Sequence, residues 1–512
     1  MEDVVVAELE AKRESGREGG GADRVAKLRS LGKLPVRQRL DLLLDEKSFE
    51  EIGVLAHSQL DSLKDRTPAD GTVTGSGKID GRTVFVSADD PTVLAGTRGR
   101  VAEVKLTRVR ELALREKKPL IMLSEAGAAR VQEARGAISA GLGKGFEHHF
   151  NMSGLVPQVS VLMGACFGGP SFVASQGDFT AMVEGTGFIG MSGPPVVKVG
   201  IGLDLPPDAI GGVEMAARVT GQVDHVGAGE AETLAAVRRY LSYFPSSAEQ
   251  APPRTAGRPA SCETAEGELA LMKLVPENQR RAYDVRKLIN LIVDEDSVFH
   301  IRPEYGKNLV IALARMAGQS VGIVANNPMH RAGVLDEKAA IKARKFIDLC
   351  DAFHIPLIFL CDTPGFLVGP EIEKHRMVSL CGRLMNSLLA ASVPKITVVL
   401  RKAVGMAYIA MCGRACHPNA IVSWPTAFFD VMGPEAGVML VYGKEIAAAD
   451  DPEARKQEIL TELETEASAY ATAGMGLIDD VIAPLETRPF ILRALERAQG
   501  CDVTGFKHRI DP

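Results

Sequence analysis

Short apolar runs alternate with amphipathic stretches along much of this 512-residue chain. Residues 119–124 read PLIMLS and follow the amphipathic stretch AEVKLTRVRELALREKKP, and residues 356–361 read PLIFLC and follow AAIKARKFIDLCDAFHIP. Continuous apolar runs of this length predict buried strands, and the amphipathic stretches between them predict helices. The alternation predicts an α/β fold with a buried sheet.

Residues 148–177 form an uncharged stretch without a single Asp, Glu, Lys or Arg. About 20 apolar residues can span a bilayer, so a membrane segment is one interpretation. However, glycines and prolines interrupt this stretch, and it contains polar Gln158, Ser160, Ser171 and Ser175. The part VPQVSVLMG instead predicts a short buried strand with turn residues at both ends, and no membrane segment is expected.

Three pairs of similar sequences recur at one constant spacing, which indicates an internal duplication. VFVSADDP is paired with VGIVANNP, KPLIMLSEAG with IPLIFLCDTPG, and VPQVSVLMGACFGGPSF with VPKITVVLRKAVGMAYI. The same interval separates all three aligned pairs of positions: Val84 and Val321, Pro119 and Pro356, Val156 and Val393. GFIGMSGP and AFFDVMGP form a later pair whose interval is only slightly longer. Because one register is kept over such a distance, two copies of one fold are predicted.

A segment rich in Pro, Ala, Ser and Gly separates the two copies and predicts a linker. We therefore expect an N-terminal domain over residues 36–243, a linker over 244–282 and a C-terminal domain over 283–512. Residues 1–35 contain GREGGGAD and are predicted to form a helical arm outside the repeat.

The composition is that of a soluble globular protein, with 46% apolar and 24% charged residues. The formal net charge of -6, without a basic stripe, gives no reason to expect nucleic-acid binding. The N-terminal sequence MEDVVVAELEAKRESG lacks the basic and apolar regions of a signal peptide, so a cytoplasmic location is expected.

The eight cysteines form no CxxC pair and no regular framework, which favours buried reduced thiols. The tightest cluster is Cys412, Cys416 and His417 in MCGRACHPN. A structural metal site normally needs four ligands, so no metal is expected here.

Two uncharged turns occupy matching positions in the two copies. The first turn is Gly168, Gly169 and Pro170, and the second turn, at the same interval along the chain, is Gly405, Met406 and Ala407. Glycine lets the backbone turn sharply and approach a ligand, and free amides at a helix start favour negative charge. One such turn alone is most simply explained by packing, but two at matched positions predict oxyanion holes. Proline at the first helical position has no N–H, so the first hole would rely on the glycine amides.

Candidate groups for proton transfer are few. Glu125 and Asp362 occupy equivalent strand ends, where helix capping or solvent contact is the simpler explanation. His148 and His149 are expected on a helix surface. The chain contains no P-loop, HExxH motif or Ser-His-Asp set, so neither nucleotide nor acyl-enzyme chemistry is supported.

The chain resembles the carboxyltransferase subunits of biotin-dependent acyl-CoA carboxylases, of the propionyl-CoA or acetyl-CoA carboxylase type. The resemblance covers nearly the whole sequence and rests on VRQRLDLLLDEKSFEEIG, DGTVTGSGKIDGRTVFV, DVRKLINLIVDEDSVFHIRPEYGKNLV, LCDAFHIPLIFLCDTPGFLVG and RKAVGMAYIAM. It implies two tandem crotonase-like domains built from ββα superhelical units. It also implies a hexamer, a trimer of dimers, in which the N-terminal domain of one chain faces the C-terminal domain of another.

The resemblance further implies transfer of a carboxyl group from carboxybiotin to the α-carbon of an acyl-CoA. The biotin would be carried by a partner, since LALMKLVPEN has Lys273 without the AMKM pattern and no ATP-binding module is found. A biotin carboxylase and a biotin carrier subunit are therefore expected partners. In this family the biotin ureido anion takes the α-proton, so no side-chain base is required.

Site residues follow from the resemblance by position. Gly168 and Gly169 would face the biotin ureido oxygen, and Met406 and Ala407, with Gly405 at the turn, would face the acyl-CoA carbonyl. Further residues expected near CoA or the acyl pocket are Gly127, Ala128, Arg130, Tyr408 and Ile409. The chain departs from its relatives in reading AGAAR where they commonly read SGGAR, and in having Met406 where many have glycine.

Other interpretations stay open at this point. The subunit could belong to a biotin-dependent acyl-CoA decarboxylase, which runs the same chemistry in reverse. The AGAAR and GMAY departures could instead mark a non-catalytic relative that only assembles a complex. A simple crotonase-type hydratase is disfavoured by the double domain and by the lack of a convincing pair of catalytic carboxylates.

Overall fold

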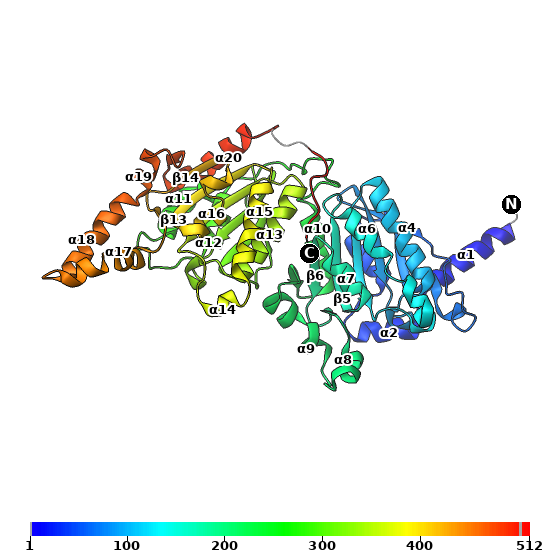
Figure 1. Ribbon diagram of the computed structural model, residues 1–512. Coiled ribbons are helices and arrows are strands. Elements are labelled where there is room, and N and C mark those ends of the chain that lie inside the picture. The colour runs from blue at the N-terminus through cyan, green and yellow to red at the C-terminus, as the bar shows by residue number, and fades with distance from the viewer. Residues whose placement is uncertain (1–2, 501–503, 512) are drawn as a thin grey trace. The chain divides into compact units, whose positions relative to one another are not determined.

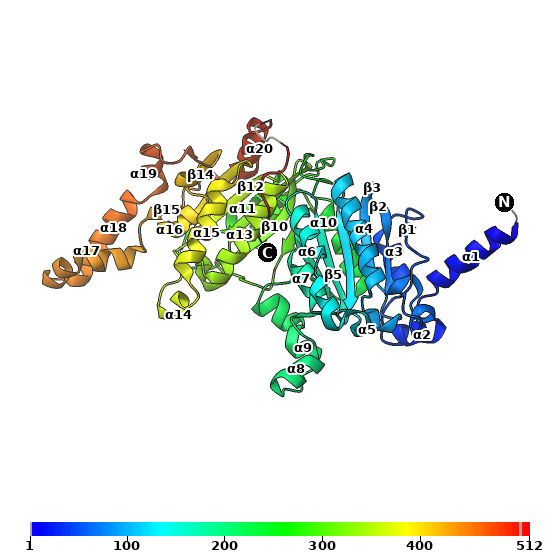
Figure 2. The same cartoon turned by 45° about the vertical axis from the view of Figure 1, so that its right-hand side comes forward.

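A computed structural model describes residues 3–500 and 504–511 of the chain. The described residues form two compact units, drawn in Figures 1 and 2. The first unit contains the residues up to 251 together with 505–511, and the second contains residues 252–500 and residue 504. The unit boundary therefore falls within the segment predicted as a linker.

The first unit is built on an eight-stranded sheet in the order β1-β2-β3-β4-β5-β6-β8, with β7 beside β5. Its strands are β1 (Glu50–Ile52), β2 (Thr72–Ile79), β3 (Arg82–Asp89), β4 (Leu120–Ala126), β5 (Gln158–Phe167), β6 (Phe179–Val183), β7 (Phe188–Gly190) and β8 (His225–Gly227). Strands β1, β2 and β3 are antiparallel, and every pairing from β3 onward is parallel.

The second unit repeats this sheet with the order β16-β14-β13-β12-β11-β10-β9 and with β15 beside β13. Its strands are β9 (Phe299–Ile301), β10 (Leu309–Met316), β11 (Gln319–Asn326), β12 (Leu357–Thr363), β13 (Lys395–Val404), β14 (Ala420–Ser423), β15 (Phe428–Asp430) and β16 (Asp480–Val481). Again the first three strands are antiparallel and the others pair in parallel. The central strands β5, β12 and β13 are buried along almost their whole length.

Helices cover both sheets. Those of the first unit are α1 (Asp3–Arg17), α2 (Ala22–Ser30), α3 (Val36–Leu43), α4 (Arg100–Glu116), α5 (Val131–Ala134), α6 (Gly145–Met152), α7 (Gly169–Ser175), α8 (Pro194–Ile201), α9 (Pro207–Gly211) and α10 (Glu230–Leu241). Those of the second unit are α11 (Ala265–Leu274), α12 (Val285–Ile292), α13 (Glu337–Ala352), α14 (Pro370–Glu373), α15 (Met377–Ala390), α16 (Gly405–Ala410), α17 (Pro434–Ala448), α18 (Pro452–Glu466), α19 (Ala469–Gly474) and α20 (Thr487–Arg497). In both views α4, α6 and α7 lie side by side on the first sheet (Figures 1 and 2).

The predicted duplication is present in the elements themselves. Strands β2 to β5 and helix α4 begin at the same constant interval before their counterparts β10 to β13 and α13. Even a buried lysine is repeated: Nζ of Lys105 donates to the carbonyl oxygens of Ala69 and Thr72, and Nζ of Lys342, its equivalent in the second copy, donates to that of Leu309. Burial lowers the pKa of Lys105 to about 8 and that of Lys342 to about 7.

The predicted linker is only partly irregular. Helix α11 lies within residues 244–282, and Leu271 on this helix packs into the core of the second unit with residues of α12 such as Leu288 and Ile289. The predicted N-terminal arm contains α1 and α2, joined at the GREGGGAD sequence.

The described residues contain no disulfide and no group of three His, Cys, Asp or Glu placed to hold a metal. Cys412 and Cys416 are buried thiols, and burial raises the pKa of Cys412 to about 12. Among the same residues, no helix combines the length and the apolar content needed to cross a bilayer.

Candidate active site

The first turn joins β5 to α7 and leaves one backbone amide without an acceptor in the part of the chain that the structure describes. Gly168 has φ 70°, a conformation that favours glycine, and its carbonyl oxygen accepts bonds from the amide and hydroxyl of Ser171 at 3.0 and 2.7 Å. The Gly168 amide makes a long bond of 3.4 Å to the Gly190 carbonyl oxygen. The exposed Gly169 amide has no acceptor among the described residues, and Pro170 has no N–H.

The second turn joins β13 to α16 and, like the first, contains a glycine at positive φ. Gly405 has φ 59°, and a Cβ at this position would lie 2.8 Å from the Val431 carbonyl oxygen. Within the described part of the chain, the amides of Met406 and Ala407 have no acceptor either. The Ala407 side chain is buried, whereas Met406 is 58% exposed. The second turn therefore offers two adjacent free donors where the first offers one.

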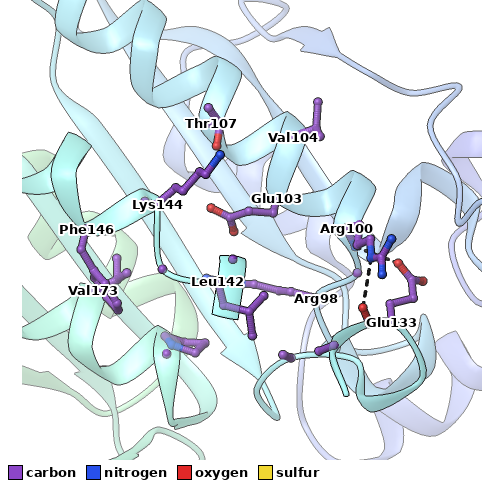
Figure 3. A pocket seen from close by; sticks show the side chains of 18 of the residues that line it. Arg98, Arg100, Glu103, Val104, Thr107, Glu133, Leu142, Lys144, Phe146 and Val173 are labelled. Atoms are coloured by element: carbon purple, nitrogen blue, oxygen red, sulfur yellow. Dashed lines mark hydrogen bonds between the residues drawn. The ribbon is translucent and has the colours of Figure 1, made fainter. Parts of the chain in front are cut away.

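A cavity of about 1010 Å³ lies in the first unit beside the first turn and under helix α4. Ala128, Gly169 and Pro170 line it together with residues of α4, α6 and the loop before α6. Figure 3 shows Lys144 and Thr107 pointing toward one another across this cavity, with Phe146 and Val173 at one end. The cavity thus brings the AGAAR loop and the first turn to one place.

The lining carries more positive than negative charge. The cationic residues are Arg98, Arg100, Arg108, Arg110 and Lys144, and the acidic residues are Glu103, Glu111 and Glu133. Arg98 is bound by Asp89 at 2.9 Å, and Arg110 by Glu103 at 2.6 Å. Arg108 and Lys144 are exposed and form no ion pair with another described residue. Such a lining favours an anionic ligand.

The AGAAR loop is fastened to the segment before α4 on both sides of Ala128. The Arg98 amide donates to the Ala128 carbonyl oxygen at 3.2 Å, and the Arg130 amide donates to the Arg98 carbonyl oxygen at 2.8 Å. Ala128 has φ 89°, in the region that favours glycine, and its Cβ lies 3.5 Å from where a Cβ on Gly168 would be. Gly127 is exposed at the tip of the loop.

Arg130 differs from the expectation of a phosphate contact. Its side chain is 1% exposed, and its Nη1 binds Asp70 at 2.6 Å and Glu133 at 2.8 Å. Its Nη2 donates to the Thr97 carbonyl oxygen at 3.0 Å. The guanidinium group of Arg130 is therefore buried and bonded within the protein. Arg130 holds the AGAAR loop in place and is not open to the solvent in the cavity.

Tyr408 and Ile409 follow the second turn on α16. The Tyr408 hydroxyl accepts a bond from the Arg414 amide at 3.3 Å, and its ring meets that of Phe429 edge-on at 5.5 Å. Burial raises the pKa of Tyr408 to about 12, so this phenol does not titrate near neutral pH. Ile409 is half-buried, with part of its side chain open to solvent.

The two strand-end carboxylates are held in buried ion pairs. Glu125 binds Lys33 and also Arg39, the latter at 2.7 Å. Asp362, which is fully buried, binds Nε of Arg401 at 2.9 Å. Neither carboxylate could act as a base without breaking an ion pair, which is costly inside a protein.

The expectation of a surface position for His149 is wrong. His149 is fully buried on α6, and its Nδ1 donates to Oε1 of Gln158 on β5 at 2.8 Å. Burial, reinforced by the charge of Arg110, lowers the pKa of His149 to about 3. His148 is half-buried.

Sequence reasoning did not find the cationic residues of the cavity. Arg108 and Lys144 stand in amphipathic or irregular sequence, where a surface position is the ordinary explanation. Comparison of the two copies gives one sequence signal for the cavity: Arg98 corresponds to the apolar Leu335 of the second copy. A charge that appears in only one copy could have drawn attention to the cavity of that copy.

Comparison with known proteins shows the family of this chain. Residues 27–503 match the family described as carboxyl transferase domain. The propionyl-CoA carboxylase carboxyltransferase subunit of Haloferax mediterranei is 37% identical over 95% of this chain and 94% of its own length. The methylmalonyl-CoA decarboxylase subunit alpha of Propionigenium modestum is 35% identical over 97% and 96%.

A solved structure extends the agreement to three dimensions. The crystal structure of transcarboxylase 12S, described as a hexamer with methylmalonyl-coenzyme A and methylmalonic acid bound, matches with a TM-score of 0.91. It is 37% identical, over 96% of this chain and 94% of that one. The predicted α/β fold of two crotonase-like units is thereby confirmed.

Proposed function

Because this chain belongs to the carboxyl transferase family, we propose that it moves a carboxyl group from carboxybiotin on a partner protein to the α-carbon of an acyl-CoA. The observation that carries this proposal is the pair of turns. Each turn follows an equivalent strand, each contains a glycine at positive φ, and each leaves at least one backbone amide without an acceptor among the described residues. Acyl-CoA carboxyl transfer needs such donors wherever negative charge develops on oxygen.

In this proposal each turn binds one of the two reactants. Gly169, with Gly168 beside it, faces the ureido oxygen of biotin, and the amides of Met406 and Ala407 face the thioester carbonyl. The Gly168 amide already makes its long bond to Gly190, so Gly169 is the main donor of the first turn. Loss of one such donor typically lowers the rate by about 100- to 1000-fold.

No side chain of this site is assigned as the base. The buried pairing of Glu125 and Asp362 with arginines supports this view, since both carboxylates are neutralised. When bound, carboxybiotin supplies both the carboxyl group and the group that takes the α-proton. The chain's part is to hold the acyl-CoA enolate through the second turn and to keep the two reactants in contact.

The cavity under α4 supports a coenzyme A site in the first unit. Its excess of positive charge suits the phosphates of CoA, with Arg108 and Lys144 as the exposed candidates instead of Arg130. Gly127 and Ala128 would then border the thioester end, next to Gly169. Tyr408 and Ile409 would line the acyl pocket beside the second turn.

The proposal includes partners and an assembly. Transfer requires a biotin carboxylase and a biotin carrier subunit, and a cytoplasmic location would suit both. The hexamer named for transcarboxylase 12S supports a hexamer of this chain as a trimer of dimers. Each active site would then combine the first turn of one chain with the second turn of another.

The test is fixation of [14C]bicarbonate by the chain together with matched partner subunits. The assay should use acetyl-, propionyl-, butyryl-, longer-chain and 3-methylcrotonyl-CoA. We expect ATP- and biotin-dependent incorporation into the acid-stable product with at least one of them. No incorporation over the whole panel would overturn the carboxylase proposal and would favour a non-catalytic assembly role.

A second candidate is the carboxyltransferase subunit of an acyl-CoA decarboxylase. It is favoured by the likeness to the methylmalonyl-CoA decarboxylase subunit alpha of Propionigenium modestum. Both candidates share the half-reaction between biotin and acyl-CoA and differ in the partner. Isolation of the native complex with its associated proteins decides between them: a biotin carboxylase supports the first candidate, and a membrane-bound decarboxylase supports the second.

A further inference from the structure

The internal duplication allows the two turns to be compared residue by residue. Met406 occupies the position in the second turn that Gly169 occupies in the first. At Gly169 an added Cβ would meet nothing within 4 Å, so the space next to that amide is open. In the second turn a methionine side chain occupies the corresponding position. Both turns contain a glycine at positive φ, but the space beside the free amide is open in the first turn and holds a methionine side chain in the second.

The Met406 side chain is the exposed apolar group of this turn. Val404, Ala407 and Ala410 around it are buried, whereas Met406 is 58% exposed. Ile409 stands three residues further along α16, on the same side of the helix, and is half-buried. Together Met406 and Ile409 form an apolar strip that begins at the free amides.

The amide and the side chain of Met406 share one Cα. A carbonyl oxygen bound by this amide lies about 2.9 Å from its nitrogen, so the group attached to that carbonyl is within reach of the four-atom side chain. Methionine is unbranched and flexible, and it fills irregular gaps beside apolar groups. The side chain can therefore reach the space beside an acyl group whose carbonyl is held by this amide.

We infer that Met406 is a specificity-determining residue that limits the acyl group to short aliphatic chains. This inference rests on the proposed function, since it assigns the acyl group to the second turn. It concerns the side chain alone, because the amide remains available whichever residue stands at this position. Met406→Gly should enlarge the site and leave the donor in place.

The test compares kcat/KM for propionyl-CoA and octanoyl-CoA in the assembled complex. We expect Met406→Gly to raise the octanoyl-to-propionyl ratio by about 10-fold or more, since a single methylene can change such ratios by about that factor. Met406→Leu, of similar volume, should keep the wild-type ratio. Met475→Ala, at a residue that is 64% exposed outside both turns, is the control for loss of a surface methionine.

A binding measurement separates this inference from the proposed function. Calorimetry with non-hydrolysable 2-oxoalkyl thioether analogues of propionyl- and octanoyl-CoA, which keep a carbonyl for the second turn, reports the acyl preference without turnover. A shift toward the octanoyl analogue in Met406→Gly supports the inference even if no transfer is detected. An unchanged or reduced octanoyl preference overturns it, even if the wild-type complex fixes bicarbonate.

Discussion

At the residue scale, comparison of the two copies shows one alanine at a position whose backbone conformation favours glycine. Ala128 has φ 89°, and its counterpart in the second copy is Gly365, with φ 137°. The surrounding bonds are also repeated, since the Leu335 amide binds the Gly365 carbonyl oxygen as the Arg98 amide binds that of Ala128. The first unit thus keeps a strained residue where the second has a relaxed one.

Ala128→Gly should stabilise the protein. The substitution removes the steric cost of a Cβ at positive φ, a gain of about 1 kcal/mol that is partly offset by the greater freedom of glycine in the unfolded chain. We expect a small rise in the thermal midpoint, measured by differential scanning fluorimetry. Ala129→Gly, at an exposed neighbour without positive φ, should give no rise. An equal rise in both variants would contradict the strain at Ala128.

Gly169→Val should abolish transfer without unfolding the protein. No atom lies within 4 Å of an added Cβ, so the fold accepts a side chain, but the branched side chain would obstruct the free amide. We expect kcat to fall by about 100-fold or more, the usual effect of losing one oxyanion donor. The matched control is Gly229→Val, also in open space and in extended backbone at the start of α10. Full activity of Gly169→Val would exclude this amide from the reaction.

Individual residues were predicted from sequence only where the backbone dictates the residue type. The positive φ of Gly168 and Gly405 follows a pattern that a sequence displays, a glycine between an apolar strand and a helix. The burial of Arg130 and His149 could not be predicted in this way. Their partners, Asp70 and Gln158, are supplied by other elements, and nothing in the local sequence indicates the pairing.

At the element scale, α6 is fastened to β5 by a reciprocal pair of hydrogen bonds. His149 donates to the side chain of Gln158 through Nδ1, and Nε2 of Gln158 donates back to the His149 carbonyl oxygen at 3.0 Å. The imidazole is buried and neutral, because burial lowers its pKa to about 3. In the unfolded chain the same group has an ordinary pKa near 6.5.

This difference predicts a loss of stability in acid. Between about pH 6.5 and pH 3 the unfolded chain binds a proton that the folded chain excludes, so the free energy of unfolding falls as the pH falls. The contribution of His149 is about 2 kcal/mol between pH 7 and pH 5. His149→Gln should reduce the acid sensitivity by this amount in urea titrations at the two pH values. His375→Gln, at an exposed histidine, should leave it unchanged, and equal pH dependence in wild type and His149→Gln would refute the assignment.

The elements were predictable where both copies keep one spacing. Strands β3 to β5 and their counterparts contain apolar runs in constant register, and the sequence displays both properties. The pairs α3 with α12 and β1 with β9 are separated by a longer interval than the later pairs. The first unit has the longer connection between its first two strands, residues 53–71 against 302–308, which interrupts the register. The constant interval of the later pairs therefore does not reveal these earlier pairs.

At the scale of the whole molecule, the proposed sharing of each site between two chains makes a quantitative prediction. Ala407→Pro should remove one donor of the second turn, and the fold should accept it because Pro170 stands at the equivalent position of the first turn. This variant and Gly169→Val should each be inactive alone. Co-expressed in equal amounts, they should regain about a quarter of wild-type activity, because half of the dimers are mixed and each mixed dimer contains one intact site of two.

The same experiment has clear contrary outcomes. Sites formed within one chain would give no recovery in the mixture. The control is co-expression of two differently tagged copies of Gly169→Val, which should remain inactive. Size-exclusion chromatography with light scattering checks the assembly, where a hexamer of the 54.7 kDa chain would measure about 330 kDa.

Pro170 has a consequence for the direction in which the reactants bind. Two identical copies of a fold would offer two equivalent binding sites, and either reactant could bind at either site. The proline leaves the first turn with Gly169 as its unbonded donor, whereas the second turn has the amides of both Met406 and Ala407. The two turns therefore differ in the number of hydrogen bonds that they can donate to an anion. In the proposed reaction this asymmetry would let backbone chemistry help to distinguish biotin from acyl-CoA, in addition to the cationic cavity that suits CoA.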